Sequence, residues 1–298
     1  AYTEVISTLG SVAFSRYDQG RNPCYGCPIG CSQVRMNRAG KYAGISTEGP
    51  EYETIYAFGG LCELDSIEEI IYLNDLCDRL GIDTITTGNL AGLTIEAVRQ
   101  GRVDYAIDYG QGEAVARLVE DIAARNGIGD TLARGIRFAA REWGMADQAI
   151  HVKGLEPAGY DPRVLKGMGL AYGSSDRGAC HLRATFYKPE LAGMVDSETI
   201  PGKAAIFTEW EDRLTLFDTF ILCRFYRDLY QWEQLAEILR DCQQVEMEIG
   251  GHGLIMLGSN NYLGLANNPE VVKAAQDIMN DWGFGLSSVR FICGTQAI

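Results

Sequence analysis

The stretch SIEEIIYLNDLCDRLGID, residues 66–83, gives the clearest indication of the fold. Its apolar residues fall on one face of an α-helix, and most of its charged residues fall on the other. Ser66 can cap the first turn, where two glutamates add favourable negative charge. Gly81 suits the left-handed position that ends a helix, and Ile82 can pack back against the last turn in a Schellman motif. The stretch therefore predicts an amphipathic helix with a defined start and end.

Three further helices are predicted along the chain, over residues 112–130, 130–145 and 208–241. The first of these should end at Asn126-Gly127, and the second should begin at Asp130 as its cap. Alternating strand patterns are scarce before residue 250. The fold class predicted for the first 240 residues is therefore mainly α, built from many helices.

The overall composition limits the classes of function. A chain of 298 residues, 46% of them hydrophobic, is long enough for one large domain or two ordinary ones. Its net charge of −14 argues against a nucleic-acid partner or an anionic membrane surface. Nine cysteines without a secretory signal indicate a reducing compartment, so we expect a cytoplasmic protein with no membrane span. The chain begins at Ala1 without Met, which we interpret as a fragment that lacks its true N-terminus.

A cysteine-rich loop is the strongest chemical signal. In NPCYGCPIGCSQV, residues 22–34, the cysteines Cys24, Cys27 and Cys31 follow a C-x2-C-x3-C spacing with turn-forming glycines and proline between them. A disulfide would use two thiols and leave the third, and structural zinc usually draws on separated pairs or on histidine. Three local thiolates plus a distant one commonly hold an iron–sulfur cube. The radical-SAM motif has its longer gap first, so the order of the gaps here argues against that motif. Three buried thiols without a metal are the plain alternative.

Six stretches, the cysteine loop among them, occur in a recognisable order. They are NPCYGCPIGC, EGPEYETIYAFG, NDLCDRLGIDTITTGN, VKGLEPAGYDPR, SSDRGACHLRATF and FDTFILCRF. Together they resemble the aldehyde ferredoxin oxidoreductase family of tungsten or molybdenum bis-pterin enzymes, over roughly residues 1–240. The resemblance implies the two helical domains of that family, domains 2 and 3, without its N-terminal β-rich domain.

The resemblance also implies an iron–sulfur centre and a pterin site. A [4Fe-4S] cluster would be held by Cys24, Cys27, Cys31 and Cys223. Contacts to a tungsto- or molybdo-bis-pterin would come from Asp78, Gly81, Asp83, Asp218 and Leu222. Carboxylates suit a pterin because they accept paired hydrogen bonds from its N–H edge. In the second motif Ile221 stands where the family usually has glycine, and without the resemblance Cys223 would be interpreted as a buried thiol on an apolar helix.

By position in the motifs, Glu53 and His181 match the family's acid/base pair. Aldehyde oxidation releases protons and two electrons, so a carboxylate can activate water while a histidine hydrogen-bonds the carbonyl oxygen. The plain alternatives are a solvated carboxylate at a helix start and a satisfied core histidine. The implied partners are a small aldehyde and a ferredoxin-like electron acceptor. The competing function is a non-catalytic iron–sulfur fragment, because the chain alone is expected not to turn over.

The C-terminal segment has a different character. NNYLGLANNPEVVKAAQ and GFGLSSVRFICGTQ resemble the start of glycine C-acetyltransferase, a pyridoxal-phosphate enzyme, over roughly residues 252–296. We predict a chimera with a junction at 241–251 and a foreign α/β-type fragment at 252–298, whose apolar strand would lack its usual sheet. Acyl transfer is excluded for this chain, because the Schiff-base lysine of that enzyme would lie beyond residue 298.

Overall fold

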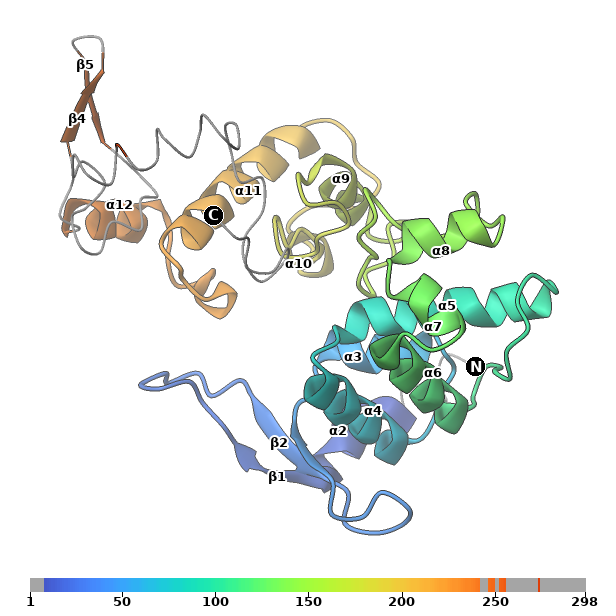
Figure 1. Cartoon of the computed structure of the whole chain (residues 1–298). Helices are drawn as coiled ribbons and strands as arrows, with labels where there is room; N and C mark the ends of the chain where they lie inside the picture. Colours follow the sequence, from blue (N-terminus) through green and yellow to red (C-terminus); the bar gives the residue numbers. More distant parts are fainter. Residues whose placement is uncertain (1–7, 242–245, 250–251, 256–272, 274–298) are drawn as a thin grey trace. The chain divides into compact units, whose positions relative to one another are not determined.

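The computed structural model describes residues 8–241, 246–249, 252–255 and Lys273 (Figure 1). The described chain is mainly helical with a few short strands, which confirms the predicted fold class. It divides into two compact units, Ala1–Thr215 and Leu216–Ile298. No helix within the described ranges is long and apolar enough to cross a membrane.

The first unit contains most of the helices. In chain order they are α2 (Ser11–Phe14), the 3₁₀ turn η1 (Ser15–Tyr17), α3 (Tyr52–Ile55), the π-helical turn η2 (Tyr56–Gly60), α4 (Ile67–Leu80), α5 (Thr84–Arg99), α6 (Gly112–Ala124), α7 (Ile128–Leu132), α8 (Ile136–Glu142), α9 (Lys166–Ser174), α10 (Tyr187–Leu191) and the greater part of α11 (Lys203–Thr219). Its strands are β1 (Asp18–Arg21), β2 (Gln33–Met36) and β3 (Ser46–Glu48).

Helix α4 has the start and end that the sequence predicts. The Ser66 hydroxyl accepts a hydrogen bond from the Glu69 backbone N–H at 3.3 Å. Gly81 is left-handed, with a φ of 68°, and the Ile82 N–H donates to the Cys77 carbonyl at 2.9 Å. This is the six-to-one hydrogen bond of a Schellman motif.

The predicted ends of the next helices are partly wrong. Helix α6 stops at Ala124, because Arg125 itself takes the left-handed conformation, with a φ of 52°, ahead of Asn126-Gly127. The single helix expected over 130–145 is broken into α7 and α8, because Gly135 has a φ of 89°. Asp130 lies inside α7, where its carboxylate pairs with two arginines instead of capping a helix.

The core of the first unit lies among η2, α4, α5 and α6. Its fully buried side chains include Phe58, Ile70, Leu73, Ile95 and Leu118. Two glycines of α5, Gly88 and Gly92, face neighbouring chain segments, and Gly88 packs directly on Ala57 of η2. A Cβ atom on Gly88 would lie 2.6 Å from both the Cβ and the carbonyl oxygen of Ala57. The close approach of α5 to η2 therefore depends on this glycine.

A small antiparallel sheet carries the cysteine loop. Its strand order is β1-β2-β3, with Arg21 opposite Gln33 and Val34 opposite Glu48. The residues between β1 and β2, 22–32, form an extended connection that contains the three clustered cysteines (Figure 1). The sheet therefore positions the cysteine loop beside β3, whose last residue is Glu48.

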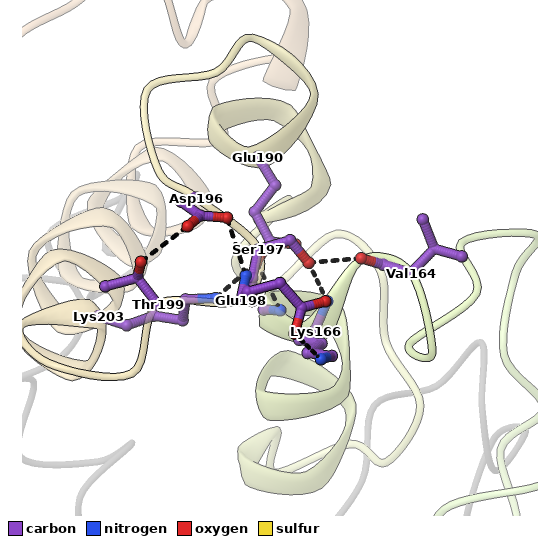
Figure 2. A network of polar contacts seen from close by, with 9 residues as sticks. Val164, Lys166, Glu190, Asp196, Ser197, Glu198, Thr199 and Lys203 are labelled. Carbon is purple, nitrogen blue, oxygen red and sulfur yellow. Dashed lines mark hydrogen bonds and ion pairs between the residues drawn. The ribbon is translucent and has the colours of Figure 1, made fainter.

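Helices α9, α10 and α11 are joined by a polar network (Figure 2). Lys203 at the start of α11 donates to Glu190 of α10 at 3.0 Å, and Glu190 also accepts from the Gly167 N–H of α9 at 2.8 Å. The side chains of Lys203 and Glu190 are only 11% and 1% exposed. A second pair in the same network, Lys166 with Glu198, is largely in solvent.

The second unit begins within α11 and continues through the 3₁₀ turn η3 (Arg224–Tyr226), α12 (Trp232–Asp241), β4 (Glu246–Ile249) and β5 (His252–Ile255). The prediction of an unpaired strand here is wrong for the described residues, because β5 pairs antiparallel with β4. The backbone groups of β5 thus find partners in β4. The expected helix at Pro269 and the glycine-rich turn after it lie outside the described residues.

Candidate functional site

An acidic cavity of about 460 Å³ lies in the first unit. It lies between the end of β3 and the short connection from α4 to α5. Its polar lining includes Glu48, Glu51, Asn74, Asp78, Asp83 and Thr84. Four of these six residues are carboxylates, and none of the described residues that line the cavity is a lysine or arginine. Such a wall presents many hydrogen-bond acceptors to a ligand that carries N–H donors.

The helix ends fix the two aspartates of this cavity. Asp78 lies in the last turn of α4, where its carboxylate accepts from the Asn74 amide at 3.2 Å and the Thr47 hydroxyl at 3.3 Å. Asp83 is the N-cap of α5 and accepts from the Thr86 N–H at 2.7 Å. Gly81 supplies the left-handed turn between them. The structure thus places the predicted Asp78 and Asp83 on the cavity wall, with Gly81 in the turn between them.

Burial changes the electrostatics of the cavity wall. It raises the pKa of the Glu51 carboxyl, and the nearby charge of Glu53 adds to this effect. Burial likewise raises the pKa of Asp78, partly offset by its hydrogen bond from Thr47. In both residues burial therefore disfavours the charged form of the carboxyl.

The cavity wall is also tied to the cysteine loop. Glu48 accepts hydrogen bonds from the Asn22 amide, at 3.0 Å, and from the Ser32 hydroxyl. These two donors are the first and last residues of the connection 22–32, and together they hold the pKa of Glu48 below its usual value. The base of the cysteine loop is therefore clamped to a residue that lines the cavity.

Glu53 and His181 lie side by side although they are far apart in sequence. His181 Nε2 is 3.4 Å from Glu53 Oε1, and the two side chains are 15% and 21% exposed. Burial lowers the pKa of His181, while the charges of Glu53 and of the cavity residue Asp83 raise it in part. Desolvation is the largest of these effects, so His181 is neutral near pH 7. A neutral imidazole can donate one hydrogen bond and accept another.

A group of tyrosines surrounds this pair, and the sequence reasoning missed it. The Tyr160 hydroxyl donates to Glu53 Oε1 at 2.9 Å, and the Tyr160 ring stacks on Tyr187 with centroids 4.0 Å apart. Burial and the charge of Glu53 raise the pKa of Tyr160, which keeps it a hydrogen-bond donor. Tyr160 belongs to the quoted stretch VKGLEPAGYDPR, so the signal was present without an assigned role.

Glu156 from the same stretch was also missed. It is only 4% exposed and accepts from the Thr86 hydroxyl at 3.1 Å. Burial raises its pKa, and the charge of Asp83 contributes in the same direction. A buried carboxylate next to the N-terminus of α5 is a group that can hold a proton beside Asp83.

The cysteine loop is open to solvent. Cys24 and Cys31 are exposed and Cys27 is half-buried, so the alternative of three buried thiols is wrong. Gly26 and Gly30 adopt positive φ values of 69° and 55°, and the Cys27 N–H donates to the Cys24 carbonyl at 2.9 Å. The loop therefore turns at Gly26 and Gly30 while leaving two of its three thiols exposed.

The three cysteines have the right side-chain chemistry for an iron–sulfur cluster, because thiolates are its usual ligands. Among the residues that the structure describes, however, no group of three or more His, Cys, Asp or Glu side chains is assembled closely enough to hold a metal. The other cysteines expected to be buried thiols, Cys62, Cys77 and Cys180, are buried, whereas Cys242 and Cys293 lie outside the described residues.

The second motif, Asp218 to Cys223, lies in the second unit. Cys223 is exposed and follows α11, so the description as a buried thiol on an apolar helix is wrong. The Asp218 carboxylate is bound by the Arg224 guanidinium at 2.7 Å. The Leu222 N–H donates to the Phe217 carbonyl at 2.8 Å, and Ile221 has a φ of 58°.

This backbone pattern repeats the end of α4. Gly81 and Ile221 occupy the same left-handed position, and Ile82 and Leu222 make the same six-to-one hydrogen bond. The local reason for glycine at this position is thus the left-handed φ, since nothing lies within 4 Å of a Cβ placed on Gly81. At Ile221 the chain adopts that conformation with a β-branched side chain, which is strained.

Replacing Ile221 by glycine should therefore stabilise the chain. We expect Ile221→Gly to raise the free energy of unfolding by about 1 kcal/mol, because it removes the left-handed strain, which costs about 1–2 kcal/mol. Little burial is lost, since Ile221 is 70% exposed. Urea unfolding followed by circular dichroism measures the change. As a control, Ile221→Ala keeps a Cβ atom and should stay within about 0.5 kcal/mol of the parent chain; an equal gain in both variants would contradict the strain explanation.

A comparison with known families identifies the class of protein. The family described as aldehyde ferredoxin oxidoreductase, domains 2 and 3, matches residues 2–251. The chain therefore belongs to the aldehyde ferredoxin oxidoreductase family, a family of oxidoreductases, and the resemblance predicted from the six motifs is confirmed.

Individual relatives agree with this assignment. The chain is 34% identical over 249 residues to a tungsten-containing aldehyde ferredoxin oxidoreductase of Pyrococcus furiosus, covering 76% of this chain and 40% of that protein. The protein of the same name from Thermococcus kodakarensis is 34% identical over 230 residues, covering 72% of this chain and 37% of the relative. The chain thus spans about two fifths of the length of these curated relatives.

A second resemblance involves a short segment. Over 60 residues, the chain is 50% identical to 2-amino-3-ketobutyrate coenzyme A ligase of Salmonella typhimurium, covering 20% of this chain and 15% of that protein. This confirms the predicted likeness of a short segment to the pyridoxal-phosphate transferase.

Proposed function

We propose that this chain is the helical part of an oxidoreductase that oxidises an aldehyde to a carboxylic acid. The observation that carries the proposal is the contact between Glu53 and His181, which the Tyr160 hydroxyl braces beside the acidic cavity. Glu53 lies between the cavity residues Glu51 and Thr54 in the chain, and Asp83 of the cavity acts on the pKa of His181. Family membership supplies the reaction class.

The cavity residues suit a pterin. Asp78 and Asp83 would hold one pterin through its N–H edge, with Gly81 shaping the turn between them. Asp218 and Leu222 would contribute a second contact from their own unit, although Asp218 already binds Arg224. The two-electron redox chemistry would be supplied by tungsten or molybdenum held on the pterins. Tungsten is the metal named for the relatives in Pyrococcus furiosus and Thermococcus kodakarensis.

The residues of this chain would handle the protons. Oxidation of an aldehyde, with water as the source of the added oxygen, gives a carboxylic acid, two protons and two electrons. Glu53 would take a proton from the attacking water, and neutral His181 would donate its N–H to the carbonyl oxygen. Tyr160 would keep Glu53 in place through its hydrogen bond. Exclusion of water from the site would strengthen each of these electrostatic contacts.

The electrons would leave through a [4Fe-4S] cluster held by Cys24, Cys27, Cys31 and Cys223, and then pass to a ferredoxin-like acceptor. What supports this route is the clamp of Asn22 and Ser32 on Glu48, because it connects the base of the cysteine loop to the cavity wall. Residues 1–240 would form the oxidoreductase part, 241–251 the junction and 252–298 the foreign fragment. The chimera proposal rests on the 60-residue likeness to another class of enzyme.

Metal analysis of the anaerobically purified chain tests this function. Cells grown with tungstate and molybdate should yield protein with about four iron atoms per chain and with tungsten or molybdenum. Iron alone would favour the alternative of a non-catalytic iron–sulfur fragment or chimeric product without turnover. Absence of all three metals would contradict both.

Single variants assign the ligands. Cys24→Ser, Cys31→Ser and Cys223→Ser should each lose most of the iron, because a cube with three protein thiolates is less tightly held. Cys180→Ala, a change at a buried thiol away from the loop, should keep its iron. Iron retained in Cys223→Ser alone would remove that residue from the ligand set.

A further inference from the structure

A second cavity, of about 440 Å³, has the opposite electrostatic character. It is lined by Arg137, Ala140, Arg141, Ala146, His151 and Lys153. Three of these six residues are cations, and none is a carboxylate. The chain as a whole carries a net charge of −14. A local concentration of positive charge in such an acidic protein is a feature that the aldehyde-oxidising site does not use.

The two arginines come from one face of α8. Arg137 and Arg141 are four residues apart, the spacing that places side chains one above the other on a helix. In the part of the chain that the structure describes, neither guanidinium forms an ion pair with a carboxylate, although other surface arginines such as Arg134 do. In the described residues, the positive charge of these two exposed arginines is therefore not neutralised by a paired carboxylate.

The backbone around Gly154 supports this arrangement. A Cβ on Gly154 would lie 2.8 Å from Cδ of Arg137, so the absence of a side chain there lets Arg137 lie close to the chain. Gly154 also donates its N–H to His151 Nδ1 at 3.3 Å. That bond uses Nδ1 as an acceptor, which leaves Nε2 of neutral His151 as a donor.

The remaining polar group is Lys153. Its ammonium donates to the Ser175 carbonyl at 2.8 Å, which fixes its long side chain and leaves further N–H donors. Burial and the two arginines lower the pKa of His151. The cavity thus offers hydrogen-bond donors and positive charge, with Lys153 and His151 held by their own hydrogen bonds and the small side chains of Ala140 and Ala146 leaving room.

We propose that this cavity binds a phosphate group. Guanidinium forks match the oxygens of phosphate and form two parallel hydrogen bonds with them, and Lys153 adds a point charge. The volume lies within the range of about 300–1,000 Å³ typical of small-molecule sites. Free phosphate and the phosphate of a small organic ester share this chemistry, so the experiment must separate them.

Isothermal titration of the purified chain with inorganic phosphate and with adenosine 5′-monophosphate, at constant ionic strength, tests the proposal. We expect one ion bound per chain. Tighter binding of the nucleotide would assign the cavity to organic phosphates, and equal affinities would assign it to the free ion; both results support a phosphate site. No binding of either at millimolar concentration would overturn it.

Variants locate the binding. Arg137→Gln and Arg141→Gln should each weaken binding at least tenfold, and Ala146→Glu, which adds a negative charge to the wall, should abolish it. Arg117→Gln is the matched control, because it removes the same charge from an exposed position outside the cavity; its affinity should stay within twofold. Equal losses of affinity in Arg117→Gln and the cavity variants would mean that phosphate responds only to the net charge of the protein, which would refute the site.

Discussion

Lys203→Met should destabilise the chain by about 3–5 kcal/mol, the typical cost of leaving a buried charge without its partner. The Glu190 side chain is only 1% exposed, and Lys203 is its one cationic partner among the described residues. Its second oxygen, Oε2, already has no hydrogen-bond partner in that part of the chain. Removing the ammonium would leave a carboxylate supported only by the Gly167 N–H. Urea unfolding at pH 7 gives the change in the free energy of unfolding.

The same network provides the control. Lys166→Met breaks the pair with Glu198, whose two side chains are 47% and 71% exposed. Exposed pairs contribute about 0–1 kcal/mol, so this variant should unfold almost like the parent chain. The double variant Glu190→Met with Lys203→Met should recover most of the loss, because no buried charge remains. Equal losses from the two lysine variants would show that burial does not set the strength of these pairs.

Gly88→Ala should cost about 2–3 kcal/mol, near the upper end of the range for overpacking a core. The new methyl group would lie 2.6 Å from Ala57, partly against its backbone, so η2 and α5 would have to move apart. Thermal unfolding followed by circular dichroism measures the loss.

Gly92→Ala is the matched control, one turn further along α5 and equally buried. Its methyl group would lie 3.4 Å from the Leu61 side chain, which is an ordinary contact. Because alanine is a better helix former, Gly92→Ala should stabilise the chain by about 0.5–1 kcal/mol. Effects of the same sign in both variants would contradict the close approach at Gly88.

The elements that the sequence predicted well are those with strong local signals. Helix α4 has a capping serine, an apolar face and a glycine stop, and all three operate as expected. The end of α6 was misplaced, because Arg125 adopts a left-handed φ that its side chain does not favour. The strands β1 and β3 are short and polar, so they carry no alternating apolar pattern that could have revealed the sheet.

The site was predictable to a different degree. The motifs marked Glu53 and His181, but only the fold brings these distant residues to within 3.4 Å. Tyr160 and Glu156 gave no signal by residue type, because a tyrosine or glutamate in a loop is ordinary. The basic cavity is formed by residues of one stretch, 137–153, but the sequence alone does not show that the chain after α8 folds back against the helix.

The hydrogen bonds from Asn22 and Ser32 to Glu48 have a thermodynamic consequence. They span the base of the cysteine loop and end on a residue of the acidic cavity, so the two places share one set of contacts. A ligand that drew Glu48 toward the cavity would weaken its hydrogen bonds with Asn22 and Ser32, and a ligand that tightened the loop would hold Glu48 in place. By linkage, each effect implies an equal effect in the other direction. We therefore expect binding in the cavity and ordering of the cysteine loop to affect each other through Glu48.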